Sequence, residues 1–324
     1  MVKIQIVSDL HLEMDWGYDT YSIPPQAPIL ALLGDIGSLI PPHRQKYINF
    51  IERHLAKFQI ADVRTCLCQY EYQTLMRAKE RDSTLGRFML LDSDRLDIPG
   101  ENVTLLGTTL FTTAPPDHRF DIFDYYYDTI VDIENWDGHQ HIAAHHDAVK
   151  WLSDTVAEIR VEDPERVVAI LTHHSPSQRF RALGYLAGED QDGITLRWSS
   201  DMSVHPVWYM DNIKLWAFGC TGYNCDYVDE ATKTRIYSNQ RGRFRECSDF
   251  GLWKVVDVAP MNPRPPLEEL KRTIERDRAE DGDDEDSSDI DDLLDPMEED
   301  TPEEDAEEEE EEERGRSRTR RGWR

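Results

Sequence analysis

Val2-Lys3-Ile4-Gln5-Ile6-Val7-Ser8-Asp9-Leu10-His11 is the stretch that decides the fold, because an apolar run ends there in an aspartate and a histidine two residues apart. Such runs are typical of β-strands buried in a sheet. A second apolar run, Ile29 to Leu33, ends in the same way in Gly34-Asp35. Two neighbouring strands would then deliver carboxylate and imidazole groups to one edge of a sheet, where these groups could bind a metal ion.

The rest of the body alternates strand-like and helical patterns. One helix is predicted after Pro41-Pro42, because apolar residues recur there at helical spacing, and another from about His141 to Ile159. Strands that first alternate with helices and then follow one another closely predict an α/β protein with mixed sheets. The further predicted strands are Val63 to Leu67, Arg87 to Leu91, Asn102 to Leu110, Arg166 to Thr172, Lys214 to Phe218, Thr234 to Asn239 and Leu252 to Val258.

The composition changes abruptly after Val258, which predicts a folded domain over residues 1–260 and an acidic tail over 261–324 that ends in an Arg-rich segment. The 324-residue chain has 36 basic and 65 acidic residues, a net charge of −29, and residues 262–324 hold 11 of the basic and 27 of the acidic ones. Like charges at this density resist collapse, so we predict a disordered tail. A short charged helix is predicted from Leu267 to about Glu280.

Charge and cysteine content narrow the class of protein. Without the tail the body still carries −13, which repels nucleic-acid phosphates and argues against general nucleic-acid binding. No apolar run approaches the roughly 20 residues of a membrane helix, so no membrane association is expected. The five cysteines are odd in number and no signal-peptide pattern is present, so we expect an intracellular protein, cytoplasmic or nuclear.

Five short motifs follow one another along the body: Asp9-Leu10-His11, Gly34-Asp35, Cys68-Gln69-Tyr70-Glu71, His173-His174-Ser175-Pro176 and Gly219-Cys220-Thr221-Gly222. In order and spacing they resemble the calcineurin-like metallophosphoesterase family, whose signature is D-x-H, G-D, G-N-H-E, H-x-P or H-H-x-P, and G-H-x-H. The resemblance spans roughly residues 1 to 258, and the residues after the last motif resemble those of intracellular, fungal-type members. It implies a four-layer α/β/β/α sandwich with two mixed sheets, followed by the disordered C-terminal tail.

The resemblance further implies a site for two divalent metal ions, bridged by Asp35. The first ion would be held by Asp9, His11 and Asp35, with position 222 as the last ligand. In the family, such a pair of ions holds a phosphoester while a bridging water or hydroxide attacks phosphorus. The second ion would be held by Asp35, Gln69, His173 or His174, and Cys220.

Four of these positions depart from the family pattern. Gly222 offers no ligand at all. Tyr70 replaces the histidine that assists the leaving group, and a phenol with a pKa near 10 donates a proton less readily than an imidazolium near 6.5. Gln69 places its amide oxygen one methylene further out than asparagine would. Cys220 could bind zinc as a thiolate, or could simply be a small buried core residue.

Two sets of histidines could each have one of two roles. For His173 and His174, metal binding stands beside a structural role in which one ring is buried and bonded to the backbone while the other is exposed. His139, His141, His145 and His146 form a further group, for which we predict a solvated helix face or a helix-end contact.

Three functions are compatible with this pattern. The first is a metallophosphoesterase-family protein in which turnover is impaired or lost, because half of the metal site is substituted. The second is an active phosphomonoesterase or phosphodiesterase with an altered metal centre. The third is a scaffold whose acidic tail binds a basic protein. The expected cofactor is a divalent Mn, Zn or Fe ion, with one ion, weak binding or none all open, and the expected ligand is a small phosphoester or a phosphorylated molecule.

Overall fold

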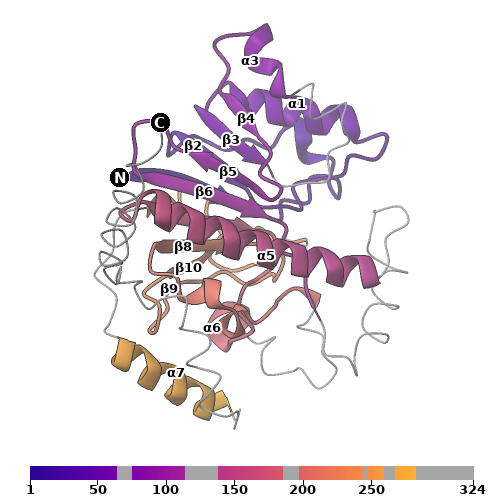
Figure 1. Ribbon diagram of the computed structural model, residues 1–324. Helices are drawn as coiled ribbons and strands as arrows, with labels where there is room; N and C mark the ends of the chain where they lie inside the picture. The colour runs from indigo at the N-terminus through magenta and orange to yellow at the C-terminus, as the bar shows by residue number, and fades with distance from the viewer. Residues whose placement is uncertain (64–74, 114–137, 185–196, 244–246, 259–266, 282–324) are drawn as a thin grey trace, which may run out of the picture. The chain divides into compact units, whose positions relative to one another are not determined.

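Two β-sheets lie at the centre of the structure, a computed structural model that describes residues 1–63, 75–113, 138–184, 197–243, 247–258 and 267–281 (Figure 1). Each sheet contains both parallel and antiparallel neighbours, so the prediction of mixed sheets is confirmed. In spatial order, the first sheet consists of β11 (Val256–Val258), β1 (Val2–Val7), β2 (Ile29–Leu32), β3 (Ile60–Val63) and β4 (Arg87–Met89). The second consists of β5 (Asp94–Asp97), β6 (Val103–Thr108), β7 (Val167–Thr172), β8 (Ile213–Phe218), β10 (Arg235–Ser238) and β9 (Asp226–Val228).

The main core lies between the two sheets. Alternate residues of β1, such as Ile4 and Ile6, share one hydrophobic cluster with Leu105 of β6 and with Ala169 and Leu171 of β7. Successive side chains of a strand point to opposite faces, so this alternation means that the two sheets face each other. Strands β2, β6 and β7 are buried along their whole length, as expected of parallel strands covered on both faces.

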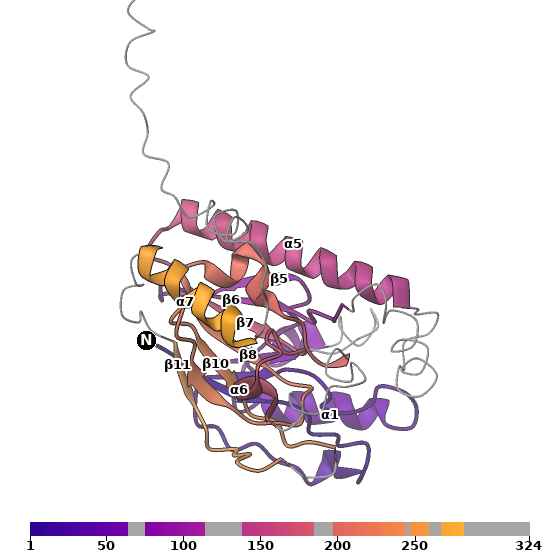
Figure 2. The same ribbon diagram turned by 90° about the horizontal axis from the view of Figure 1, so that it is seen from below.

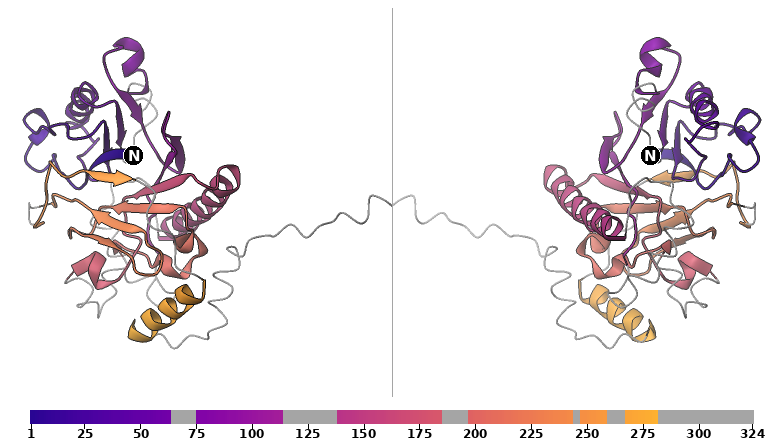
Figure 3. Two further views of the ribbon diagram at one scale, coloured as in Figure 1. Left: turned by 90° about the vertical axis from the view of Figure 1, so that its left-hand side faces the viewer. Right: turned by 90° about the vertical axis from the view of Figure 1, so that its right-hand side faces the viewer.

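Helices cover the outer faces. The apolar side of α1 (Arg44–Leu55), including Tyr47 and Ile51, packs in one cluster with Leu30 and Leu32 of β2. Figure 2 and the left-hand view of Figure 3 show α5 (Gly138–Glu162) on the other side of the strands from α1, alongside the second sheet. The remaining helical elements are η1 (Gly17–Asp19), α3 (Ala78–Arg81), α6 (Phe180–Leu183), η4 (Met202–Val204), η5 (Pro206–Tyr209) and α7 (Leu267–Asp281).

The predicted helix after residue 266 is present as α7. Its side chains Leu270 and Ile274 are buried, and Arg276 forms an ion pair of 3.3 Å with Glu230. Residues 1–284 form one compact unit. The acidic segment that follows α7 lies outside the described residues, so its predicted disorder stays a prediction. No helix in the described part of the chain combines the length and the apolar character that a bilayer crossing requires.

Candidate metal centre

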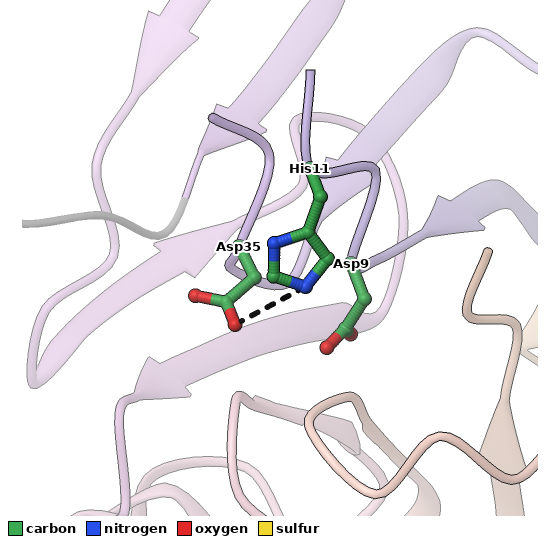
Figure 4. A group of neighbouring side chains, drawn as sticks. All are labelled: Asp9, His11 and Asp35. Carbon is green, nitrogen blue, oxygen red and sulfur yellow. Dashed lines mark ion pairs between the residues drawn. The ribbon is translucent and has the colours of Figure 1, made fainter. Parts of the chain in front are cut away.

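Asp9, His11 and Asp35 meet at one edge of the first sheet, as the sequence predicts (Figure 4). Strands β1 and β2 are parallel and in register, with Val7 beside Leu32, so the loops that follow them leave the sheet at the same level. Backbone hydrogen bonds join these loops, from Asp9 N to Gly34 O at 3.0 Å and from His11 N to Asp35 O at 2.9 Å. As a result, one ligand atom from each of the three side chains lies within 4.8 Å of the other two.

The backbone is left-handed at the three residues of this group and at Cys220 in the last motif. The φ angles are 52° at Asp9, 45° at His11, 48° at Asp35 and 71° at Cys220. A residue with a side chain rarely adopts this conformation, and such strain gathers at sites where the surrounding structure determines the geometry. The loop-to-loop hydrogen bonds provide that determination, and they turn the three side chains toward one another.

The ring of His11 is held in place by Glu13. The His11 Nδ1 atom lies 3.1 Å from Glu13 Oε1, and its Nε2 atom lies 3.6 Å from Asp35 Oδ2 (Figure 4). Because a carboxylate only accepts, Nδ1 donates to Glu13 and Nε2 faces the aspartates. Burial lowers the pKa of His11, but the hydrogen bond that the ring donates to Glu13 and the charges of Asp35 and Asp9 raise it, so the net pKa is raised.

Asp9 is buried, and the last motif of the body closes over it. The backbone N–H of Cys220 donates to the carboxylate, at 3.2 Å to Oδ1 and 3.0 Å to Oδ2. This approach depends on Gly219, where a Cβ would lie 2.2 Å from Ser8 Oγ and 2.7 Å from Asp9 Oδ2. Burial raises the pKa of Asp9, with a further rise from Asp35 that the nearby His173 opposes.

His173 reaches the same place from the second sheet, where it follows β7. Its Nδ1 atom lies 2.9 Å from the carbonyl oxygen of Leu33, so Nδ1 donates and Nε2 is left as an acceptor. That Nε2 atom lies 3.9 Å from Asp35 Oδ1. The geometry therefore leaves metal binding open to His173, although it is not in the group of three.

His174 is buried, and its Nδ1 atom lies 3.2 Å from the carbonyl oxygen of Thr109. Burial lowers the pKa of His174 well below its usual value, and the neighbouring His173 and His141 lower it further. The ring is therefore neutral and is bonded to the backbone, as in the structural interpretation of this residue.

The other residues predicted as metal ligands are not part of the group of three side chains. Among the described residues, the metal-ligand group does not include the thiol of Cys220. Burial raises the pKa of that thiol well above its usual value, and Asp9 and Asp35 raise it further, so the metal-free protein holds a protonated thiol. Apart from the two neighbours of Gly222 in the chain, no described residue has an atom within 4 Å of where its Cβ would be. Gln69 and Tyr70 lie outside the described residues.

Of the two predictions for the helix histidines, a solvated face or a helix-end contact, the solvated face is wrong for His141 and His145, which are 4% and 1% exposed. The Nε2 atom of His141 accepts from the backbone N–H of Thr112 at 3.0 Å, and His145 Nδ1 lies 2.9 Å from the carbonyl oxygen of Leu110. Both rings turn inward because the helix carries them over the loop that follows β6. His146 is exposed, as predicted.

The donor set fits a divalent cation. Two carboxylates and one imidazole offer the oxygen and nitrogen atoms that Mn²⁺, Fe²⁺ or Zn²⁺ binds, and the side chain of Asp35 is 49% exposed, which gives a ligand access to the site. Sequence reasoning missed Glu13, which orients His11. Its signal was the polar residue at every second position after β1, namely Asp9, His11 and Glu13.

Comparison with known proteins gives a match at the level of fold. Neither a protein-family model nor a curated protein sequence matches the chain. Among solved structures, the crystal structure of phosphopantetheinyl hydrolase (PptH) from Mycobacterium tuberculosis matches with a TM-score of 0.53 and 12% identity, over 82% of this chain and 98% of that chain. At this identity the likeness shows that the two proteins share a fold.

Proposed function

We propose that the protein is a calcineurin-like metallophosphoesterase-family member that binds one divalent cation and in which phosphoester hydrolysis is weakened or lost. One observation carries the proposal: Asp9, His11 and Asp35 converge within 4.8 Å at the carboxyl ends of two parallel strands. The fold that the chain shares with a phosphopantetheinyl hydrolase supports it. The ligand would be a small phosphoester or a phosphorylated molecule.

Each residue of the site has a distinct part. Asp9 and Asp35 supply carboxylate oxygens, and His11 supplies Nε2 in an orientation that Glu13 fixes. A bound divalent ion would neutralise phosphate charge and lower the pKa of a coordinated water. The N–H of Cys220 holds the Asp9 carboxylate in position.

The position predicted for a second metal ion lacks good ligands. Gly222 has no side chain where the family motif has a histidine, and the Cys220 side chain is a protonated thiol in the metal-free protein. A second ion would therefore depend on His173, Asp35 and the amide of Gln69. Because in-line displacement gains most from two ions that clamp the attacking and leaving oxygens, a single ion predicts poor turnover.

Manganese titration with elemental analysis tests the proposal, since Mn²⁺ favours oxygen ligands. We expect one Mn²⁺ per chain and slow or undetectable hydrolysis of an aryl phosphoester. Asp35→Asn should remove the bound ion, whereas Asp154→Asn should not, because Asp154 is an exposed residue of α5 paired with Lys150 at 2.6 Å. Manganese content that is unchanged by Asp35→Asn would refute the proposal.

The same assay decides between weakened and full activity. Hydrolysis at an ordinary enzymatic rate, on the order of 1–10³ per second, that is lost in Asp35→Asn would establish the alternative, an active phosphomonoesterase or phosphodiesterase with an altered metal centre. Hydrolysis that persists in Asp35→Asn would point to a contaminant.

A further inference from the structure

His145 carries a buried nitrogen atom that has no use in the site above. His145 belongs to α5 and its side chain is buried. Its Nδ1 atom lies 2.9 Å from the carbonyl oxygen of Leu110. A carbonyl only accepts, so Nδ1 holds the proton and Nε2 holds a lone pair. Among the described residues, Nε2 has no hydrogen-bond partner. A buried acceptor without a partner destabilises the folded protein, and a bound ligand would offset this cost.

The protonation state of His145 is that of a metal ligand. Burial lowers its pKa to about 4, the Leu110 carbonyl opposes this shift, and the rings of His146 and His205 lower the pKa further. The imidazole is therefore neutral at physiological pH. A backbone carbonyl on one ring nitrogen is also the usual way in which a protein presents the other nitrogen to a metal.

Two further imidazole rings lie near the ring of His145. The ring centre of His146 lies 5.6 Å from that of His145, and the ring centre of His205, between η4 and η5, lies 6.4 Å from it. Rings that share a tetrahedral zinc with Zn–N bonds of about 2.0–2.1 Å have centres about 5 Å apart. His146 is exposed and His205 half-buried, so both rings have room to turn toward a shared ion.

The carboxylate of Asp201 lies near His205. Asp201 caps η4, where its Oδ1 atom accepts from the N–H of Ser203 at 2.9 Å and from its hydroxyl at 2.7 Å. The charge of Asp201 also acts on His205. His141, on the same helix, has a different role, because its Nε2 atom is occupied by Thr112.

We propose that His145, His146 and His205, with Asp201 as the adjacent carboxylate, form a second metal site that takes a nitrogen-seeking ion such as Zn²⁺. Among the described residues, the ligand atoms that already lie within 4.8 Å of one another are those of Asp9, His11 and Asp35. The histidine site therefore closes when the ion binds, with His145 as the fixed ligand and the other two rings turning toward it. This site does not rest on the proposed function.

The test uses the full chain with the first site disabled by His11→Gln and Asp35→Asn. We expect this double variant to bind one Zn²⁺ per chain by calorimetry, to show the visible absorption of tetrahedral Co²⁺, and to melt at a higher temperature with zinc. Adding His205→Gln or His146→Gln should weaken zinc binding at least about tenfold. Both residues lie outside the core, so these variants should fold.

His139→Gln is the matched control, because His139 is an exposed histidine of the same helix. It should leave zinc binding unchanged. Absence of zinc binding in the double variant would overturn the second site. Binding that resists both His146→Gln and His205→Gln would overturn it as well, since the ion would then be held elsewhere. Neither result would affect the manganese titration of the first site.

Discussion

Gly34 lies against the imidazole of His173, so that a Cβ on Gly34 would be 2.2 Å from Nδ1 and 2.8 Å from Cγ of that ring. The two residues follow strands of different sheets, β2 and β7. The absence of a side chain at position 34 is what lets His173 reach the carbonyl oxygen of Leu33 and point Nε2 at Asp35.

Gly34→Ala should therefore displace His173. We expect a loss of roughly 2–4 kcal/mol in the free energy of unfolding, from steric overlap together with a φ of +116° that alanine tolerates poorly. Urea denaturation measures this loss. Gly100→Ala is the control, because Gly100 has a φ of +79° but no atom within 4 Å of its Cβ position, and it should lose only about 1 kcal/mol. Equal losses would mean that the contact with His173 has no energetic weight.

Glu13→Gln should weaken metal binding without removing a ligand. The amide would still meet His11 Nδ1 but would not stabilise a positive charge on the ring, and outer-shell changes of this kind typically reduce metal affinity about 10- to 100-fold. Calorimetric titration with Mn²⁺ gives the dissociation constant. Glu162→Gln, which removes a surface partner of Arg95, should leave that constant unchanged. An unaltered affinity in Glu13→Gln would show that Glu13 does not tune the site.

Gly222→His should strengthen metal binding. The space at this position is open, and histidine is among the residues that accept a φ of +66°. Gly222→Ala brings the same backbone strain without a ligand, so the difference between the two variants isolates the imidazole. We expect manganese affinity to rise about tenfold or more in Gly222→His alone. Combining it with Cys220→His, Gln69→Asn and Tyr70→His should raise metal content and aryl phosphoesterase activity further, and an unchanged protein would contradict the assignment of these positions.

His54 should make stability depend on pH. Burial lowers the pKa of His54 from 6.5 to about 4, and the charges of Lys57 and Arg53 lower it further, against the opposing hydrogen bond to Phe50. Between these two pKa values the unfolded chain binds a proton that the folded chain does not. Stability is therefore fully present above pH 6.5 and falls as the pH drops toward 4, by about 3 kcal/mol for this group.

Denaturation in urea at a series of pH values, with a chelator present, measures this slope. His54→Gln should fold with lower stability, because Ile23 N donates to His54 Nε2 at 3.0 Å, but its stability should fall less steeply with acid. His139→Gln, at an exposed position of α5, should keep the slope of the parent protein. A slope unchanged by His54→Gln would assign the acid sensitivity to other groups.

The interior strands could be predicted from the sequence, whereas the edges of the second sheet could not. Strands such as β2 and β7 are buried along their whole length, so their sequences are nearly continuous apolar runs. The two strands that were missed, β5 and β9, are the edges of that sheet, and their short, charged and partly exposed sequences carry no such run. Strand β3 begins at Ile60, three residues before the predicted start at Val63.

The candidate site was predictable where a ligand directly follows a strand, as with Asp9 and Asp35. The contributions of Gly34, Gly219 and the Cys220 amide were not, because they arise from close approaches between loops far apart in the chain. The order of residue types along the chain does not show which backbone groups will face a carboxylate. For the same reason, the inward turn of His145 could not be distinguished from a solvated helix face.

The left-handed backbone at Asp9, His11 and Asp35 has a consequence for how such a protein can change over time. Hydrogen bonds between the peptide groups of neighbouring loops fix this conformation, so no ion is needed to hold the backbone of the site in place. A chain in which individual metal-binding side chains are replaced would keep the same backbone. The metal-free and metal-bound forms of the protein should therefore superpose. Metal-binding side chains can then be lost one substitution at a time while the backbone conformation around them is kept.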